Sequence, residues 1–316
     1  MVGTTGIEPG PSLREGCFPQ KAVSNPLIFM HPEYRKGFVL TLLGVLIFTP
    51  DALLIRLTNL EFFSLTVGRG TIGGLAMLLG LAIYYRRDFK KQILAIGGWG
   101  LVLAVLQGSF TWTFYAALKN TSVANVLVFL ASVPLIAALM TKMFLQDEIQ
   151  KPTWIAIGTA VFGLLIVGSR GLTGGNWLGD FLALMSAVIM AGFFTVVRGR
   201  RAVNLIPATG FGLLLAALVA YPFAVFPEMS SSQWVYLIVG AGIVLPVALG
   251  LLTLGPRYIP APEAAMLILL ETVLGPLWVW LVISEQPDVN TIIGGAIVVG
   301  TLFLHALWRM RQVNTA

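Results

Sequence analysis

Ten apolar stretches follow one another along the chain, and the charged residues gather between them. The stretches are residues 37–56, 62–85, 93–117, 121–144, 152–169, 179–197, 207–227, 233–254, 261–283 and 290–308. A helix needs about 20 mostly apolar residues to cross the hydrocarbon core of a bilayer, so each stretch predicts one membrane-spanning helix. The connectors are too short to fold as soluble domains, and we therefore expect the functional residues to lie among the helices.

The composition agrees with a membrane domain. Of the 316 residues, 57% are hydrophobic and only 11% are charged, whereas a typical soluble domain is about a quarter charged. We therefore expect an all-α integral membrane protein surrounded by the lipid bilayer. The net charge of +6 does not indicate nucleic-acid binding, because the basic residues lie at the span ends and form no single patch.

The basic residues favour alternate sides of the spans. With the N-terminus inside, ten spans place 16 Lys and Arg residues on the cytoplasmic side and leave three, Arg56, Lys119 and Arg170, outside. Arg69 lies within a span. Because cytoplasmic loops are enriched in Lys and Arg, both termini are predicted to be cytoplasmic. Short connectors and the lack of a sorting signal favour a multi-pass protein of a bacterial inner membrane.

The N-terminal segment differs from the rest of the chain. Residues 1–29 are rich in Gly, Pro and Ser, and they show no helical period. They lack the apolar core of a signal peptide, so we expect disorder there, or a true start at Met30. Residues 1–36 are thus expected to form an extension with a cytoplasmic lead-in, and residues 309–316 a cytoplasmic tail.

The sequence predicts no cofactor and no metal site. Cys17 is the only cysteine, and His31 and His305 lie at opposite ends of the chain without an HExxH motif, so a zinc site is not expected. The glycine-rich residues 171–179 lack the GK[ST] of a phosphate-binding loop. ATP-driven transport is therefore not indicated.

The two halves of the chain show weak sequence similarity to each other. The segment Ala124–Val167 recurs as Ala261–Leu304 at an offset of 137 residues. The matching pairs are Glu148 and Glu285, Ile155 and Ile292, Gly158 and Gly295, Gly163 and Gly300, and Leu165 and Leu302. Each half would hold five spans, an odd number, so the second half would be inverted in the membrane. Inverted repeats are typical of transporters whose substrate site lies near the midplane.

The same segments resemble the EamA repeat of the drug/metabolite transporter (DMT) superfamily. The stretch ALKNTSVANVLVFLASVPLIAALMTKMFLQDEIQKPTWIAIGTAVFGLLIVG carries the "AL…ts.a" helix start, a mid-helix proline, an acidic residue after the span and two glycines in the next span. The stretch APEAAMLILLETVLGPLWVWLVISEQPDVNTIIGGAIVVG is similar to the family pattern "LEPV…gE…iG…G", with Thr272 at the usual proline. The resemblance covers residues 37–308. It implies ten helices in two inverted five-helix repeats, 37–169 and 179–308, and alternating access.

Glu271 is the leading candidate for the functional site, because ionisable residues within spans are costly and often functional. It lies near the middle of the ninth predicted span, between LILL and TVLGP. It would carry a proton or pair with a cationic group of a substrate. The alternative is a structural hydrogen bond between helices.

Asp51 and Arg69 are further candidates within spans. Asp51 follows Pro50, which frees a backbone carbonyl and could form a polar notch beside the acid. The alternative is an interfacial Asp51 that pairs with Arg56 or Arg69. Arg69 could hold a substrate carboxylate, but we favour a structural pair with Asp51 or Glu61.

Polar and aromatic side chains on the third and fourth spans complete the predicted substrate contacts. These are Gln107, Trp112, Tyr115 and Asn125. Trp112 and Tyr115 share one helix face and could stack on a planar substrate, although packing is the commoner role of such aromatics. Glu148 and Glu285 are expected to cap or orient helices.

Four prolines are predicted to break spans, namely Pro50, Pro134, Pro246 and Pro276. Broken helices near a central cavity suit transporters, although passive kinks are also known. Gly70 and Gly74 form GxxxG, for which close packing within the bundle is favoured over a homodimer interface.

These features predict a secondary transporter, and by resemblance an exporter, of small metabolites such as amino acids or amines, with possible proton coupling. A sugar-phosphate or nucleotide-sugar exchanger of the same superfamily is the alternative, but the ninth predicted span has no Lys or Arg to grip phosphate. A membrane-embedded enzyme is less favoured, because Asp147-Glu148 is the only adjacent acidic pair and such enzymes need metal-binding carboxylates or a nucleophile set.

Overall fold

The protein is all-helical throughout the part that the computed structural model describes, which is residues 32–121, 126, 129–168, 177–226, 228–284 and 289–314. The helices of the first half are α1 (Pro32–Phe48), α2 (Asp51–Thr58), α3 (Phe62–Tyr85), η2 (Arg86–Asp88), α4 (Phe89–Ala95), α5 (Gly97–Asn120), α7 (Val133–Met140), η3 (Thr141–Leu145) and α8 (Lys151–Gly168). Those of the second half are α9 (Trp177–Gly199), α10 (Ile206–Ala220), η4 (Tyr221–Phe223), α11 (Ser231–Val239), η5 (Gly240–Val244), α12 (Leu245–Leu254), η6 (Gly255–Arg257), α13 (Ala261–Ile283) and α14 (Val289–Asn314).

Several helices are long and apolar enough to cross a membrane. Seven such stretches occur in the described residues, and three shorter apolar helices, Val133–Leu145, Lys151–Ile166 and Ile292–His305, lie where the fourth, fifth and tenth spans are predicted. The predicted domain bounds and the predicted N-terminal disorder fall partly on residues outside the described ranges.

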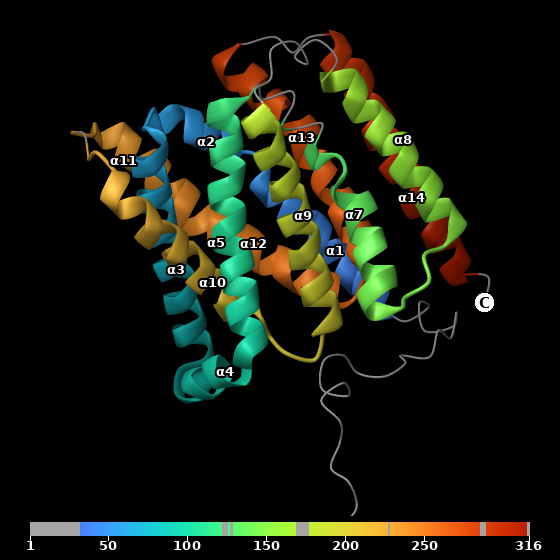
Figure 1. Ribbon diagram of the computed structural model, residues 1–316, viewed down its shortest axis with the longest axis horizontal. Coiled ribbons are helices and arrows are strands. Elements are labelled where there is room, and N and C mark those ends of the chain that lie inside the picture. The colour runs from blue at the N-terminus through green and yellow to red at the C-terminus, as the bar shows by residue number, and fades with distance from the viewer. Residues whose placement is uncertain are drawn as a thin grey trace, which may run out of the picture.

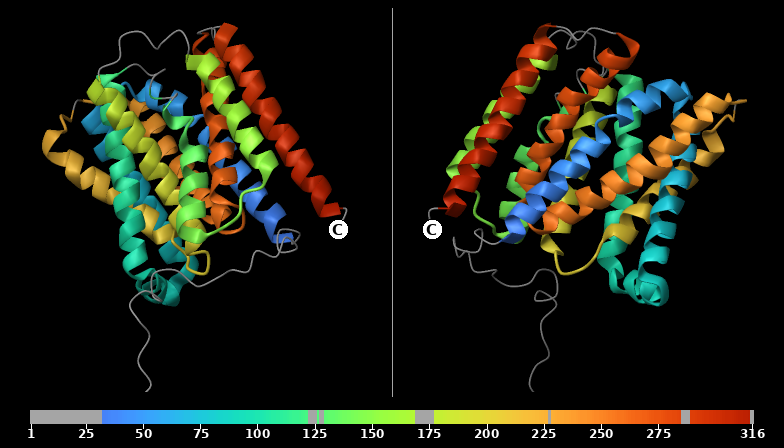
Figure 2. Two further views of the ribbon diagram at one scale, coloured as in Figure 1. Left: turned by 45° about the vertical axis from the view of Figure 1, so that its right-hand side comes forward. Right: turned by 180° about the vertical axis from the view of Figure 1, so that it is seen from behind.

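The helices of the two halves interleave. In the bundle α3 packs on α10, α5 packs on α9 and α10, and α7 packs on α9 and α13. The first helix, α1, packs on α12 and α13. The pair α8 and α14 lies at one edge of the molecule, where α13 links it to the rest (Figure 1, Figure 2). The start of α1, the short α4 and the end of α14 lie toward the same end of the bundle (Figure 1).

Close contact between helices depends on small residues. A Cβ atom added at Gly70 of α3 would lie 2.6 Å from the Leu213 carbonyl oxygen of α10, and one at Gly74 would lie 2.9 Å from the Gly210 carbonyl oxygen. In lipid, helices associate through such close backbone approach rather than through the hydrophobic effect. The GxxxG of α3 therefore packs within the bundle, as predicted.

Three of the four prolines lie between two helices or in the first turn of one. Pro50 separates α1 from α2, and Pro134 stands in the first turn of α7. Pro246 stands in the first turn of α12, directly after the π-helical turn η5. Pro134 costs little, because the N–H that it lacks would have no partner in the first turn of a helix.

The predicted break at Pro276 is wrong. α13 runs as one helix from Ala261 to Ile283, with Pro276 in its interior. An interior proline removes one backbone hydrogen bond and clashes with the carbonyl four residues earlier. The remaining hydrogen bonds can hold the helix together, since membrane helices tolerate prolines when neighbouring groups satisfy the freed carbonyl.

We expect Gly70→Ala to destabilise the protein by about 1–3 kcal/mol, because the added methyl group must displace the α10 backbone. Gly80 lies on the same helix, and a Cβ added there meets no atom within 4 Å. Gly80→Ala should therefore be neutral or stabilising by up to about 1 kcal/mol. Thermal unfolding in detergent compares the two variants. Equal midpoints would contradict the close α3–α10 contact.

Candidate functional site

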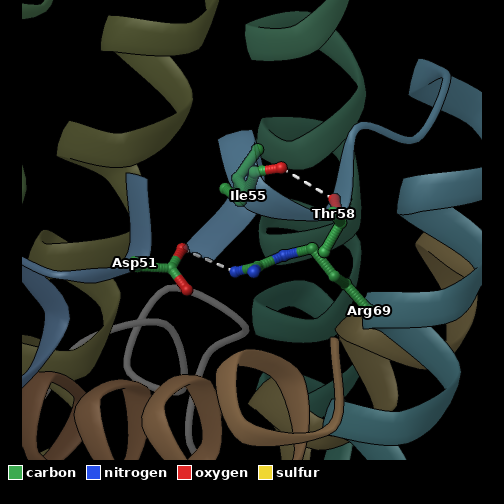
Figure 3. Close-up of polar contacts among 4 residues, drawn as sticks. All are labelled: Asp51, Ile55, Thr58 and Arg69. Carbon is green, nitrogen blue, oxygen red and sulfur yellow. Dashed lines mark hydrogen bonds and ion pairs between the residues drawn. The ribbon is translucent and has the colours of Figure 1, made fainter. Parts of the chain in front are cut away.

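A buried ion pair links α2 to α3. The Arg69 Nη2 atom donates a hydrogen bond of 2.6 Å to Asp51 Oδ2 (Figure 3). Asp51 is only 3% exposed and Arg69 6% exposed. Because buried charges require partners, each residue depends on the other. The structure thus brings together two of the predicted site residues, in the structural pair that was favoured for Arg69.

The chain around Asp51 is shaped to hold the pair. Thr49 and Pro50 interrupt the first span, so that Asp51 is the first residue of α2. This helix is only eight residues long and ends at Thr58. The Thr58 hydroxyl donates a hydrogen bond of 2.7 Å to the Ile55 carbonyl (Figure 3). Asn59 then adopts a left-handed conformation with φ 48°, which Asn tolerates better than most residues. The chain can thereby turn back into α3, which carries Arg69.

A glycine of the second half leaves room for the guanidinium. A Cβ atom added at Gly240 would lie 3.4 Å from Arg69 Nη1. Gly240 begins the π-helical turn η5, and π-helical turns are frequent at functional sites. The pair therefore lies against the π-helical turn of the eighth predicted span.

One oxygen of the pair has no partner. Among the described residues, Asp51 Oδ1 is buried and makes no hydrogen bond. A buried carboxylate oxygen without a donor lowers the stability of the folded state, and such atoms are rare in native proteins. A donor brought by a ligand would satisfy it.

Tyr115 and Glu271 complete the cluster. The Tyr115 side chain, on α5, lies within electrostatic range of the Arg69 guanidinium. Glu271, on α13, lies within electrostatic range of Asp51, Arg69 and Tyr115. Its side chain is half-buried, and no described residue hydrogen-bonds to its carboxyl group. We refer to Asp51, Arg69, Tyr115 and Glu271 as the central cluster.

Thr49 and Trp278 support the cluster and were missed by the sequence analysis. Trp278 Nε1 donates to Thr49 Oγ1 at 2.9 Å, which joins α13 to the break just before Asp51. Trp278 follows Glu271 by seven residues, so the two share one face of α13. That spacing was the available signal, but the partner on the first span could not be read from it.

The other predicted contacts lie elsewhere or cannot be placed. Trp112 donates from Nε1 to the Ala216 carbonyl of α10 at 3.2 Å and packs against Phe63, with ring centroids 5.7 Å apart. Gln107 is 8% exposed and lies against Gly212 of α10. Asn125 and Glu285 lie outside the described residues, and Glu148 is exposed after η3.

A second polar cluster lies at the end of the bundle where α9 ends and α13 begins. The Tyr34 hydroxyl donates to Glu263 Oε2 at 2.6 Å. Arg198 Nε lies 3.6 Å from Asp147 Oδ2, and its Nη1 donates to the Arg257 carbonyl at 3.2 Å. These bonds tie α1 to α13 and α9 to the segments that follow η3 and α12. Tyr34, Asp147, Arg198 and Glu263 are called the inner cluster below.

Neither cluster resembles a metal site. Among the described residues, no group of three or more His, Cys, Asp or Glu side chains is close enough to hold a metal ion.

Comparisons with known proteins identify the family. The model of the EamA-like transporter family matches residues 35–169 and again residues 177–307. One solved structure, described as a crystal structure of a protein, superposes with a TM-score of 0.75 at 17% sequence identity. The match covers 87% of this chain and 97% of the other, and at that identity it shows the fold alone. The search of curated proteins gave no match.

We expect the buried pair to behave non-additively. Arg69→Gln or Asp51→Asn alone leaves one buried partner unpaired, which costs about 3–5 kcal/mol. The double variant should lose less than the sum of the two, since no lone charge remains. Thermal unfolding of the three variants gives the coupling, with Arg56→Gln on the exposed side of α2 as the control. Additive losses would contradict the pairing.

Proposed function

The chain belongs to the EamA-like transporter family of the drug/metabolite transporter superfamily, and we propose that it is a secondary transporter that exports small metabolites by alternating access. The observation that carries this proposal is the central cluster. Its ionisable side chains come from helices of both halves, within segments long and apolar enough to cross a membrane. Such intramembrane charges mark substrate or ion pathways.

The helix contacts support two inverted five-helix repeats, residues 37–169 and 179–308. We propose that α1 with α2 corresponds to α9, α3 to α10, α5 to the segment from α11 to α12, α7 to α13, and α8 to α14. Exchanging counterparts turns the contact of α5 with α9 into that of α12 with α1, and the contact of α7 with α9 into that of α13 with α1. It turns the contact of α5 with α10 into that of η5 with α3. A pseudo-twofold arrangement would produce this pattern.

The positions of the two clusters support alternating access. The inner cluster joins α1, α9 and α13 at one end of the bundle, so it holds that end together. Opening that end would require the Tyr34–Glu263 and Arg198–Asp147 contacts to separate. The breaks at Pro50 and Pro134, and the π-helical turn before Pro246, provide places where helices can bend.

Each residue of the central cluster has a proposed role. Glu271 binds a proton or a cationic substrate group, and Asp51 with Arg69 orients the substrate. Tyr115 lines the same space, and Trp112 supports it through its contacts with α3 and α10. Gln107 and Asn125 remain proposed substrate contacts.

Transport of phosphorylated substrates is not supported by the cluster. Phosphate recognition needs cationic donors, and the cluster has one guanidinium, whose positive charge is already balanced by Asp51. Small metabolites such as amino acids or amines fit the carboxylates better.

We expect Glu271→Gln to reduce transport at least about tenfold and to flatten its dependence on pH, because the amide can neither bind nor release a proton. The charged or titratable groups that face Glu271, namely Asp51, Arg69 and Tyr115, are unchanged in this variant. Flux into proteoliposomes at several pH values measures the effect. The control is Glu61→Gln, at the exposed residue before α3, which should keep the wild-type profile. A folded Glu271→Gln protein with wild-type rate and pH profile would refute the proton role.

We also propose that the protein lies in a bacterial inner membrane with both termini in the cytoplasm. The basic residues of η2 and α4, and those after α9, should then face the cytoplasm. Green fluorescent protein fused to the C-terminus should fluoresce, and periplasmic alkaline phosphatase fused there should be inactive. The reverse result would overturn this orientation. Whether two copies of the chain form a homodimer is a separate prediction.

A further inference from the structure

We propose that the substrate of the central cluster is a monocationic primary amine with an apolar or aromatic body, rather than a zwitterionic amino acid or an anion. This inference rests on the proposed transport function and assigns the substrate class of the same site. Its basis is the mismatch between donors and acceptors in the cluster.

The charges of the central cluster do not balance. Asp51 and Glu271 are two carboxylates, and among the residues that the structure describes Arg69 is the one guanidinium found to act on both. The next arginine along α2, Arg56, is exposed. With both carboxylates ionised, the cluster therefore carries one negative charge in excess. A substrate with a single positive charge neutralises it, whereas a zwitterion or an anion does not.

The cluster also has more hydrogen-bond acceptors than donors. Asp51 Oδ1 is buried without a donor, and no described residue hydrogen-bonds to the Glu271 carboxyl group. Ionised carboxylates only accept hydrogen bonds, and an ammonium group has three donors and no acceptor. One ammonium group placed between Asp51 Oδ1 and Glu271 would supply both with a charge-assisted hydrogen bond.

A substrate carboxylate would have to share the Arg69 guanidinium with Asp51. Arg69 already donates to Asp51 Oδ2 at 2.6 Å. A carboxylate that displaced Asp51 from Arg69 would leave a buried aspartate without its cation, which is strongly unfavourable. An ammonium group leaves the Asp51–Arg69 pair intact.

Aromatic rings adjoin the cluster. Tyr115 lies against Phe62, with ring centroids 4.9 Å apart, and Phe62 meets Trp112 at 6.3 Å. Trp278 stands two turns beyond Glu271 on α13 and bonds to Thr49. The ring faces attract cations and provide apolar contact for the rest of the substrate. The surroundings therefore suit an amine with an aromatic or alkyl body.

The test compares small ligands with apolar bodies that carry different charged groups. Phenethylamine is the cation, phenylalanine the zwitterion, phenylacetate the anion and phenethyl alcohol the neutral compound, with hexylamine as an alkyl cation. Thermal unfolding of the detergent-purified chain is measured with each, because a ligand that binds the folded state raises the midpoint. We expect phenethylamine or hexylamine to raise it, and the zwitterion, anion and alcohol to have little effect.

Variants of Asp51 and Glu271 test whether these two carboxylates cause the rise in unfolding temperature. Asp51→Asn and Glu271→Gln should each weaken amine binding about tenfold or more, the loss expected for one charge-assisted hydrogen bond. Glu271→Asp keeps a carboxylate and should retain part of the binding, and Glu61→Gln should retain all of it. Circular dichroism and size-exclusion chromatography confirm that each variant is folded. If Asp51→Asn does not fold, the comparison of Glu271→Gln with Glu271→Asp decides.

The outcomes separate this inference from the proposed function. A shift from phenylalanine or phenylacetate that equals or exceeds that from the amines overturns the amine assignment, and so does the absence of any shift from both amines. Flux of radiolabelled amines and amino acids into proteoliposomes is measured in parallel. Transport of amino acids but not amines refutes the substrate class while the transport function stands. Amine binding that depends on Glu271, without flux of any solute, refutes transport while the amine site stands.

Discussion

The buried pair between Asp51 and Arg69 is the constraint on which the centre of this structure depends. A charge among membrane helices must be paired or face water, and these two side chains are only 3% and 6% exposed. The 2.6 Å contact requires α2 to start at Asp51, beyond the break at Pro50. It also brings Arg69 Nη1 next to Gly240 of the second half, where an added Cβ atom would lie 3.4 Å from it, at ordinary van der Waals distance. The break between α1 and α2 therefore places Asp51 where it can pair with Arg69.

Close backbone contacts surround this polar centre. Gly70 and Gly74 let α3 approach α10 so nearly that a methyl group would reach the carbonyl oxygens of the neighbour. The same helix α3 carries Arg69, one residue before Gly70. The packing of α3 and the placement of the guanidinium are thus fixed by adjacent residues. A change at either one should disturb the other, since additivity fails for residues that share a contact.

The membrane helices and the Asp51–Arg69 pair could be predicted from the sequence, whereas the helix ends and the contacts between distant helices could not. Long apolar stretches identify membrane helices because lipid demands them, but they do not mark the helix ends. α1 begins at Pro32, five residues before the predicted span, since polar residues can continue a helix beyond the membrane. The pairing of Arg69 with Asp51 was favoured because an intramembrane charge needs a partner nearby. The contacts of Trp278 with Thr49 and of Tyr34 with Glu263 each join residues 229 positions apart. Only the packing of distant helices creates such contacts, and no local pattern encodes them.

The distribution of the central cluster between the halves has a consequence for the proposed movement. Asp51 and Arg69 belong to α2 and α3 of the first half, whereas Glu271 belongs to α13 of the second half. If the halves rock against each other, the Asp51–Arg69 pair can persist as a unit while its distance from Glu271 changes. The electrostatic cost of ionising Glu271 depends on that distance. Movement and the charge on Glu271 are therefore linked, so a cation or proton that binds Glu271 favours one arrangement of the halves, as differential binding to two states requires.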